Sequence, residues 1–315
     1  MDHASHTRIL AADAAGIAEG VRLLQGGGLV AVPTETVYGL AARADRDESV
    51  AAIYRAKGRP SFNPLIVHVA DAAAGQALAE FDARAVALAE SFWPGPLTMV
   101  LPLREGARVA AAVTAGLSTV ALRCPAHPVM RAVIGAAGLP LAAPSANASG
   151  GVSPTCAQHV LATLDGRIDA VIDGGACEAG VESTIVALRA DGTWQMLRPG
   201  PISQEQVATV LGGMNRPVTS QEIEAPGQLA SHYAPGKPLR LDALAAEADE
   251  FHIGFAAVRG TVSLSPGGDL NEAAARLYAL LHEAARSALP RIAVAPVPET
   301  GVGAAINDRL RRAAA

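Results

Sequence analysis

The sequence is poor in cysteine and in aromatic side chains. Its 315 residues include three cysteines, and Phe, Trp and Tyr together make up 3%. Cys124, Cys156 and Cys177 are odd in number and form no CxxC pair, so neither a disulfide framework nor a zinc ribbon is indicated. This cysteine usage fits a reducing compartment, and we expect a cytoplasmic protein. So few aromatics argue against a base-stacking platform for single-stranded nucleic acid.

Long apolar runs and leader segments are also missing. No purely apolar run of about 18 residues occurs, so we expect neither a membrane span nor a membrane partner. The first residues, MDHASHTRIL, lack a basic region followed by an apolar one, so no signal peptide is predicted. The net charge of −5 argues against a surface that grips nucleic acid over its whole extent, although it is compatible with a local basic cleft.

Several common catalytic motifs are absent. The chain has no GxxxxGK[ST], no HExxH, no GxSxG and no GxGxxG after a strand, which excludes the usual phosphate loop, zinc-protease helix, hydrolase elbow and dinucleotide fingerprint. No tight Asp/Glu cluster occurs either, so we expect no permanent metal site. A nucleotide would have to bind by a less common arrangement.

The chain does have a globular balance, with 50% hydrophobic and 17% charged residues. Helical spacing alternates with short apolar runs through residue 212, which predicts an α/β domain around one sheet. Residues 213–238 have no clear period and are rich in Pro, Gly, Gln and Ser, as in an extended linker. Helical and strand-like patterns then resume. We therefore predict domains at 1–212 and 239–315 joined by a linker at 213–238.

The segment KGRPSFNPLIVHV, residues 57–69, is the most informative one. Lys57 and Arg59 flank a glycine, and two prolines fix the path of the loop around Asn63. A rigid loop that carries cations into a strand suits a phosphorylated ligand. The alternative is a solvated Lys/Arg pair, with His68 as an ordinary core histidine, and this segment alone does not decide between them.

Polar groups recur at other predicted strand ends. PTETVYGL follows the apolar run LVAV, and Ser145 and Asn147 follow LPLAA, although turns also prefer such residues. Arg123 lies in a very apolar strand and needs an anionic partner, which a ligand or a structural acid could supply. Arg198 repeats this design in LRPG. Such strand-end cations indicate a polyanionic substrate, or one with both phosphate and carboxylate.

The motifs PTETVYGL, KGRPxxNPLIVHV, WPGPLT, STVALRCP, PSANxSGxxSPT, VESTIV and LRPG occur here in that order. This series resembles the YrdC-like threonylcarbamoyl-AMP synthases, strongly over about residues 28–240. The linker, with SHYAPGKPL, looks like that of the longer, two-domain Sua-type members. The resemblance implies an α/β fold with an open, twisted YrdC-like sheet and a concave cleft, plus a smaller Rossmann-like α/β domain at the C-terminus.

The resemblance also implies an activity. Such a nucleotidyltransferase condenses L-threonine, bicarbonate or CO2, and ATP into threonylcarbamoyl-AMP and pyrophosphate. Other tRNA-modifying proteins then use the product to make threonylcarbamoyladenosine, so direct tRNA binding is expected to be weak or transient. Mg2+ is expected to arrive with ATP and to keep most of its waters.

The resemblance assigns roles to individual residues by motif. Positioning and charge neutralisation dominate such chemistry, and Lys57 and Arg59 are the expected catalytic groups. Threonine would be held by Thr36, His68, Arg123 and Ser183. ATP would be held by Lys57, Arg59, Asn63, Thr119, Ser145, Asn147, Ser153, Thr155, Arg198 and Tyr233. The Pro-rich linker is the expected cover of the site.

Three other functions stay open at this point. A module for double-stranded RNA or tRNA would use a basic concave face and show steep salt dependence. A related carbamoyl-transfer enzyme would need additional regions and cysteine pairs that this chain lacks. A threonine or nucleotide sensor would keep the binding residues without turnover.

Overall fold

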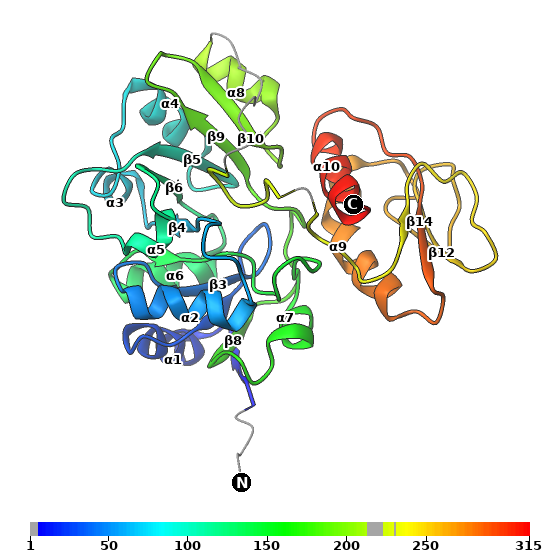
Figure 1. Ribbon diagram of the computed structural model, residues 1–315, viewed down its shortest axis with the longest axis horizontal. Helices are drawn as coiled ribbons and strands as arrows, with labels where there is room; N and C mark the ends of the chain where they lie inside the picture. The colour runs from blue at the N-terminus through cyan, green and yellow to red at the C-terminus, as the bar shows by residue number, and fades with distance from the viewer. Residues whose placement is uncertain (1–5, 213–222, 230) are drawn as a thin grey trace.

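The computed structural model describes residues 6–212, 223–229 and 231–315 (Figure 1). The first five residues, and residues 213–222 and 230 of the predicted linker, lie outside the described residues. The division into 1–212, 213–238 and 239–315 stays a prediction. Among the described helices, none is long and apolar enough to cross a membrane.

A large mixed sheet organises the first two thirds of the chain. Within the described residues it has ten strands in the order β1-β8-β2-β3-β7-β4-β6-β5-β9-β10. The strands are β1 (Arg8–Ala11), β2 (Val30–Val32), β3 (Gly39–Arg43), β4 (Ile66–His68), β5 (Leu97–Pro102), β6 (Thr119–Arg123), β7 (Leu141–Ala142), β8 (Ala170–Asp173), β9 (Thr184–Leu188) and β10 (Trp194–Arg198). In the parallel pair β4 and β6, His68 lies opposite Arg123, so two predicted site residues meet at one edge.

Helices cover both faces of this sheet. They are α1 (Ala14–Gln25), α2 (Asp47–Lys57), α3 (Ala72–Gln76), α4 (Ala83–Phe92), α5 (Ala111–Thr114), α6 (Pro128–Ala137), α7 (Ala157–Leu164) and α8 (Gln204–Leu211). Val30 packs with α1 and α6, whereas the adjacent Ala31 packs into the core that holds α2 and α4. Since neighbouring strand residues point to opposite faces, the two cores lie on opposite sides of the sheet.

Local sequence explains where α6 begins and ends. Pro128 occupies its first turn, where a missing N–H costs nothing, and Gly138 ends it in the left-handed region with φ 68°. Pro128 and Gly138 thus set the bounds of α6 locally.

The C-terminal part forms its own small α/β unit. Its four strands run parallel in the order β11-β14-β12-β13. Its elements are β11 (Leu239–Arg240), β12 (Glu250–Gly254), β13 (Val262–Ser263), α9 (Leu270–Arg286), β14 (Arg291–Val294) and α10 (Gly303–Ala313). In Figure 1, α9 and α10 lie on the side of this unit that faces the large sheet. The predicted α/β class, with a large sheet and a smaller second α/β domain, is confirmed.

Candidate active site

A cavity lies between the edge of the large sheet and the linker that crosses it. Eight of the residues predicted to bind substrates line this cavity. They are Thr36, Arg59, His68, Arg123, Ser145, Ser183, Arg198 and Tyr233. The cavity contains about 530 Å3 of empty space up to its mouth. The centre of a water molecule can occupy only about 40 Å3 of it. Linker residues therefore fill much of the space that a ligand would need.

Arg59 reaches the cavity because α2 ends in a sharp turn. Gly58 takes φ 60° just after the helix, a conformation that glycine adopts without strain. The guanidinium of Arg59 then donates to the main-chain carbonyls of Asn63 (3.2 Å) and Pro64 (3.0 Å). Burial lowers the pKa of Arg59 to about 10, so it stays charged at neutral pH. It has no carboxylate partner among the described residues, which leaves its charge for a ligand.

Lys57 has a different position, although it is two residues away. Its Nζ is buried and donates to the carbonyl of Ser145 at 2.6 Å and to that of Asn147. Burial, together with the charge of Arg59, lowers the pKa of Lys57 well below its usual value. Lys57 thus clamps the loop that carries Ser145 and does not line the cavity itself.

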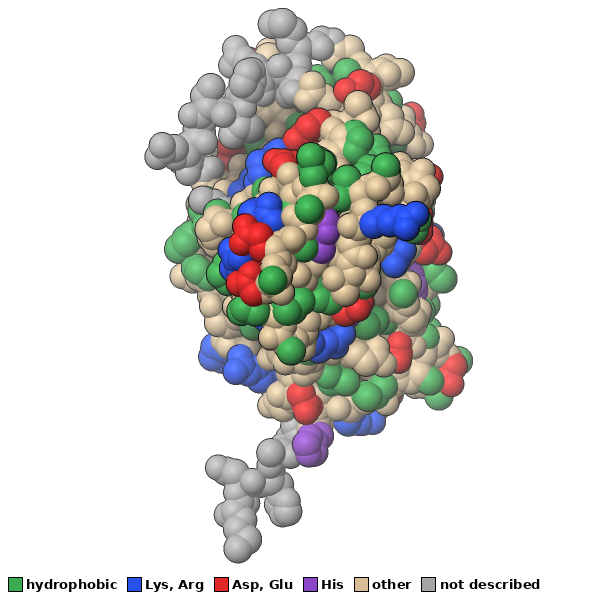
Figure 2. All heavy atoms as spheres, turned by 90° about the vertical axis from the view of Figure 1, so that its right-hand side faces the viewer, with side chains coloured by type: hydrophobic (Ala, Val, Ile, Leu, Met, Phe, Trp, Pro, Cys, Tyr) green, Lys and Arg blue, Asp and Glu red, His purple; other side chains and the backbone are tan. Residues whose placement is uncertain are grey.

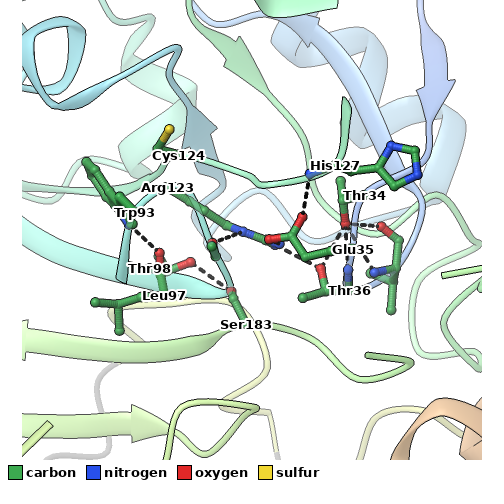
Figure 3. A network of polar contacts seen from close by, with 12 residues as sticks. Thr34, Glu35, Thr36, Trp93, Leu97, Thr98, Arg123, Cys124, His127 and Ser183 are labelled. Carbon is green, nitrogen blue, oxygen red and sulfur yellow. Dashed lines mark hydrogen bonds and ion pairs between the residues drawn. The ribbon is translucent and has the colours of Figure 1, made fainter. Parts of the chain in front are cut away.

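Arg123 pairs with a carboxylate at the wall of the cavity (Figure 3). It donates to Glu35 Oε1 (2.7 Å), Thr36 Oγ1 (2.9 Å) and the Gly95 carbonyl (3.3 Å). Burial raises the pKa of Glu35, but the charge and hydrogen bond of Arg123 outweigh burial, and the pKa lies below its ordinary value. The anionic partner expected for Arg123 is therefore a structural acid. Each terminal nitrogen of Arg123 keeps one further N–H that could bind a ligand.

His68 presents a neutral ring to the same cavity. It is 2% exposed, and burial, reinforced by the charge of Arg123, lowers its pKa to about 3. Its Nδ1 is buried and finds no partner among the described residues. Since buried polar atoms in native proteins are normally paired, this nitrogen marks a place for a ligand or water contact.

Ser183 and Arg198 form the opposite wall. The Ser183 hydroxyl lies 2.8 Å from Thr98 Oγ1 and accepts from Arg198 Nη2 at 3.1 Å. Arg198 also donates to the Ser183 carbonyl (3.0 Å) and to the Pro226 carbonyl of the linker (3.3 Å). It is fully enclosed, and no carboxylate pairs with it among the described residues. Like Arg59, it carries a buried charge that an anionic ligand could balance.

The remaining predicted nucleotide residues do not line the cavity. Asn147 donates to the carbonyls of Ala148 (3.0 Å) and Gly151 (2.9 Å) and so shapes its own loop. Thr155 Oγ1 lies 3.3 Å from His159 Nδ1. Asn63, Thr119 and Ser153 also lie outside the set of lining residues. The ligand-binding roles of all these residues stay predictions.

Tyr233 brings the linker into the site. It is 1% exposed and stacks on Tyr278 of α9, with ring centroids 5.7 Å apart. Arg309 of α10 lies 5.5 Å from the centre of its ring. Its neighbour His232 also lines the cavity, and the Ala234 N–H donates to the Gly150 carbonyl at 2.9 Å. The linker is therefore held by both domains where it covers the cavity.

Two carboxylates near the cavity were not predicted as site residues. Glu35 pairs with Arg123, and Glu182 lines the cavity. Both lie in motifs named above, PTETVYGL and VESTIV. An acidic residue in an otherwise apolar or hydroxyl-rich segment was the signal that could have identified them. Neither has an oxygen free of protein partners, because Glu35 also accepts from the His127 N–H and Glu182 accepts three hydrogen bonds.

Comparison with known proteins agrees with this geometry. Residues 22–200 match the Sua5/YciO/YrdC family, which carries the description telomere recombination, and residues 202–315 match the threonylcarbamoyl-AMP synthase C-terminal domain. The threonylcarbamoyl-AMP synthase of Bacillus subtilis is 41% identical over 322 residues, covering 95% of this chain and 92% of that protein. The one from Pyrococcus abyssi is 38% identical and covers 91% and 90%.

A solved structure extends the similarity to three dimensions. The crystal structure of P. abyssi Sua5 complexed with L-threonine superposes with a TM-score of 0.90 at 36% identity, covering 98% of both chains. Both domains are included at that coverage. The chain therefore belongs to the Sua5/YciO/YrdC family and has the two-domain arrangement of its Sua5 members.

Proposed function

We propose that this protein condenses L-threonine, bicarbonate or CO2, and ATP into threonylcarbamoyl-AMP and pyrophosphate, for threonylcarbamoyladenosine formation in tRNA. One observation carries the proposal. Arg59, Arg123 and Arg198 converge on one buried cavity, and two of them have no carboxylate partner among the described residues. A ligand with both a carboxylate and phosphates would balance them. The relationship to threonylcarbamoyl-AMP synthases, one of which was solved with L-threonine, supports threonine and ATP as that ligand pair.

The threonine half of the site is built around Arg123. Its two spare N–H groups suit the substrate carboxylate, since guanidinium binds carboxylate as a fork. The Glu35 carboxylate fixes the plane of the guanidinium, and Thr36 and Ser183 offer hydroxyls beside it. The neutral ring of His68 supplies a nitrogen that carries no charge to repel the ammonium group of the substrate.

The nucleotide half is proposed to use Arg59, Ser145 and Arg198. These side chains lie on separate segments that Lys57 and the linker hold together. We assign Lys57 a positioning role in this scheme, because its Nζ serves the loop carbonyls. Asn63, Thr119, Asn147, Ser153 and Thr155 remain candidates that an open form of the cavity could bring to ATP.

The reaction needs little covalent chemistry from the protein. The threonine amine adds to CO2 and loses a proton to give a carbamate. A carbamate oxygen then attacks the α-phosphorus of ATP, and pyrophosphate leaves with the bonding electron pair. Positioning and stabilisation of negative charge dominate such transfers, and the three arginines supply both.

Magnesium is proposed to enter with ATP and to remain bound mainly to phosphates and water. The residues present do not fit a permanent protein site. Glu35 and Glu182 are engaged with Arg123 and with Arg309, Tyr278 and Ser153. No group of three potential His, Cys, Asp or Glu ligands occurs in the described parts of the chain.

The linker is proposed to move when substrates enter. Pockets for ligands of this size hold roughly 300–1,000 Å3, whereas this cavity has about 40 Å3 for water centres. Pro226, Gly227, His232 and Tyr233 occupy the intervening space. A cover over the site would also protect the labile carbamate from water.

An RNA-binding module is the second candidate. Figure 2 shows the face formed largely by the C-terminal unit, where basic and acidic side chains lie interspersed over the described residues. Binding to a phosphate backbone favours a continuous basic surface instead. The proposed partners are small substrates and downstream tRNA-modifying proteins. We propose a cytoplasmic location from the cysteine usage alone.

Pyrophosphate release from ATP tests the function directly. The purified protein is assayed with threonine and bicarbonate, each present or omitted. Release that requires both supports the proposal. Absence of release by a folded protein under every combination contradicts it, and salt-dependent tRNA binding would then support the second candidate.

A further inference from the structure

Glu182 joins the two domains at the wall of the cavity. It precedes β9, and its Oε1 accepts a hydrogen bond from the Ser153 hydroxyl at 2.5 Å. Its Oε2 accepts from the Tyr278 hydroxyl at 2.8 Å and from Arg309 Nε at 2.9 Å. Tyr278 lies on α9 and Arg309 on α10. Both donors to Oε2 therefore come from the C-terminal domain.

This ion pair is shielded from solvent. The side chain of Arg309 is 0% exposed and that of Glu182 is 7% exposed. Burial raises the pKa of Glu182, but the charges of Arg309 and Arg198 and the Ser153 hydroxyl outweigh it and lower the pKa to about 2. Glu182 is thus ionised at neutral pH, and a buried carboxylate needs a partner of opposite charge.

The loop before Glu182 is pressed onto the C-terminal domain. Gly180 has φ +68°, and a Cβ there would lie 2.4 Å from the Ala274 carbonyl oxygen of α9. On the other side, the Ala179 N–H donates to the Glu35 carbonyl at 2.8 Å. The same short loop therefore touches α9 and the residue that orients Arg123.

Ser153 contacts Glu182 through one polar end and the C-terminal domain through the other. Its hydroxyl donates to Glu182, and its carbonyl oxygen accepts from His282 Nε2 of α9 at 3.1 Å. Ser183 shares a peptide bond with Glu182, and its hydroxyl contacts Arg198. A displacement of Glu182 therefore affects Ser183, which lines the cavity, and Ser153, which lies outside its lining.

We propose that Glu182 is a positioning residue through which Arg309 and Tyr278 of the C-terminal domain set the nucleotide side of the active site. This inference rests on the proposed function. Arg309 neutralises a carboxylate that would otherwise face an anionic nucleotide at close range. The C-terminal domain is in this sense a part of the active-site wall.

Steady-state kinetics of full-length variants test the inference. The variants are Arg309→Met, Glu182→Gln and their combination, with Arg311→Met as the matched control. Arg311 lies on the same helix but is exposed and pairs with Glu299. We expect Arg309→Met to raise the KM for ATP by about 10-fold or more and the KM for threonine by less than about 3-fold, because an unpaired carboxylate repels phosphate at short range.

The double variant distinguishes positioning from a general packing role. Adding Glu182→Gln removes the unpaired charge, so the KM for ATP should return to within about 3-fold of Glu182→Gln alone. Losses that simply multiply, or an Arg309→Met protein equal to the parent, would overturn the inference. Thermal unfolding identifies variants that fail to fold. Tyr278→Phe, which deletes one hydroxyl, then serves as the milder change and should raise only the KM for ATP.

Failure of this inference can be distinguished from failure of the proposed function. If the unsubstituted protein releases no pyrophosphate, the proposed function has failed, and calorimetric binding of ATP becomes the readout. Weaker ATP binding by Arg309→Met that Glu182→Gln rescues would still support the coupling. Absence of rescue, or of ATP binding by the unsubstituted protein, rejects it.

Discussion

Arginine side chains have different partners at the two sheets of this protein. At the edge of the large sheet, Arg59 and Arg198 are buried and donate to carbonyls and one hydroxyl, without a carboxylate partner among the described residues. At the small sheet, Arg240 and Arg291 lie near the surface and pair with nearby carboxylates. Two arginines at the cavity therefore lack a carboxylate partner among the described residues, whereas these two arginines of the small sheet are neutralised locally.

This difference indicates that an anionic ligand would complete the charge balance at the cavity, but not at the small sheet. A buried cation without a counterion is costly, and carbonyl oxygens offset that cost only in part. The protein folds with these buried cations unpaired, but a bound anion would stabilise the folded state further. Substitutions at the two sheets should therefore affect activity and stability in different proportions.

The largest effect is expected from Arg123→Met. The variant loses the proposed carboxylate fork and leaves Glu35 buried without its cation. Two charged hydrogen bonds contribute about 3–6 kcal/mol, so kcat/KM for threonine should fall by at least about 100-fold. Pyrophosphate release measures this loss. Activity within a factor of a few of the parent would contradict the assignment of Arg123 to threonine.

Arg198→Met should have the next largest effect. It removes an unpaired buried charge and a link to the linker, and the KM for ATP should rise by about 10–100-fold. Because the parent charge lacks a carboxylate partner, unfolding stability should change less than in Arg123→Met. Equal loss for threonine and ATP would show that Arg198 supports both halves of the site.

Lowering the pH should reduce the stability of the folded protein, because His68 is buried in its neutral form. Its pKa is about 3 in the folded protein and about 6.5 in an unfolded chain, so unfolding takes up a proton between these values. Stability is therefore complete above about pH 6.5 and falls as the pH is lowered. Urea unfolding at pH 7.5 and pH 5 should show a loss of about 2 kcal/mol from this group, which His68→Gln removes.

The exposed His6 provides the control for that experiment. His6→Gln is the matched histidine substitution at an exposed position, since the side chain of His6 is 86% exposed. An unchanged pH dependence in His68→Gln would contradict the assignment of a buried, neutral ring.

The smallest effect is expected at the surface of the small sheet. Arg291→Met breaks exposed contacts with Asp249 and Glu247. Exposed ion pairs contribute little, so the unfolding midpoint should stay within about 2 °C of the parent and both KM values should be unchanged. A large loss of activity in this variant would remove the contrast between the two sheets.

Much of the fold was predictable from local signals. Apolar runs predicted β2, β4 and β6, and the alternation of helical spacing with such runs predicted the α/β class. The sequence did not predict β1, β3, β13, α3 or α5. These are short, or rich in alanine, or lie at a sheet edge like β1, so their conformation depends on neighbours distant in sequence.

The sequence predicted many residues of the site, but not which residues interact with one another. Arg123 required an anion, yet its partner Glu35 lies 88 residues away, and the sequence alone gave no means of choosing it. Lys57 and Arg59 were grouped as one pair of cations, although the turn at Gly58 sends one to a loop and the other to the cavity. Glu182 escaped notice because its cation is 127 residues away, in another domain.

The distance between Glu182 and Arg309 also matters while the protein is being made. Every strand of the large sheet has been synthesised by residue 198, whereas Arg309 leaves the ribosome more than one hundred residues later. Domains generally fold as they emerge, at about 5–20 residues per second. For several seconds, a nascent chain therefore has the strands of the large sheet but lacks the Arg309 that pairs with Glu182. The inferred coupling between the domains predicts that the nucleotide site is complete only when the last helix is in place.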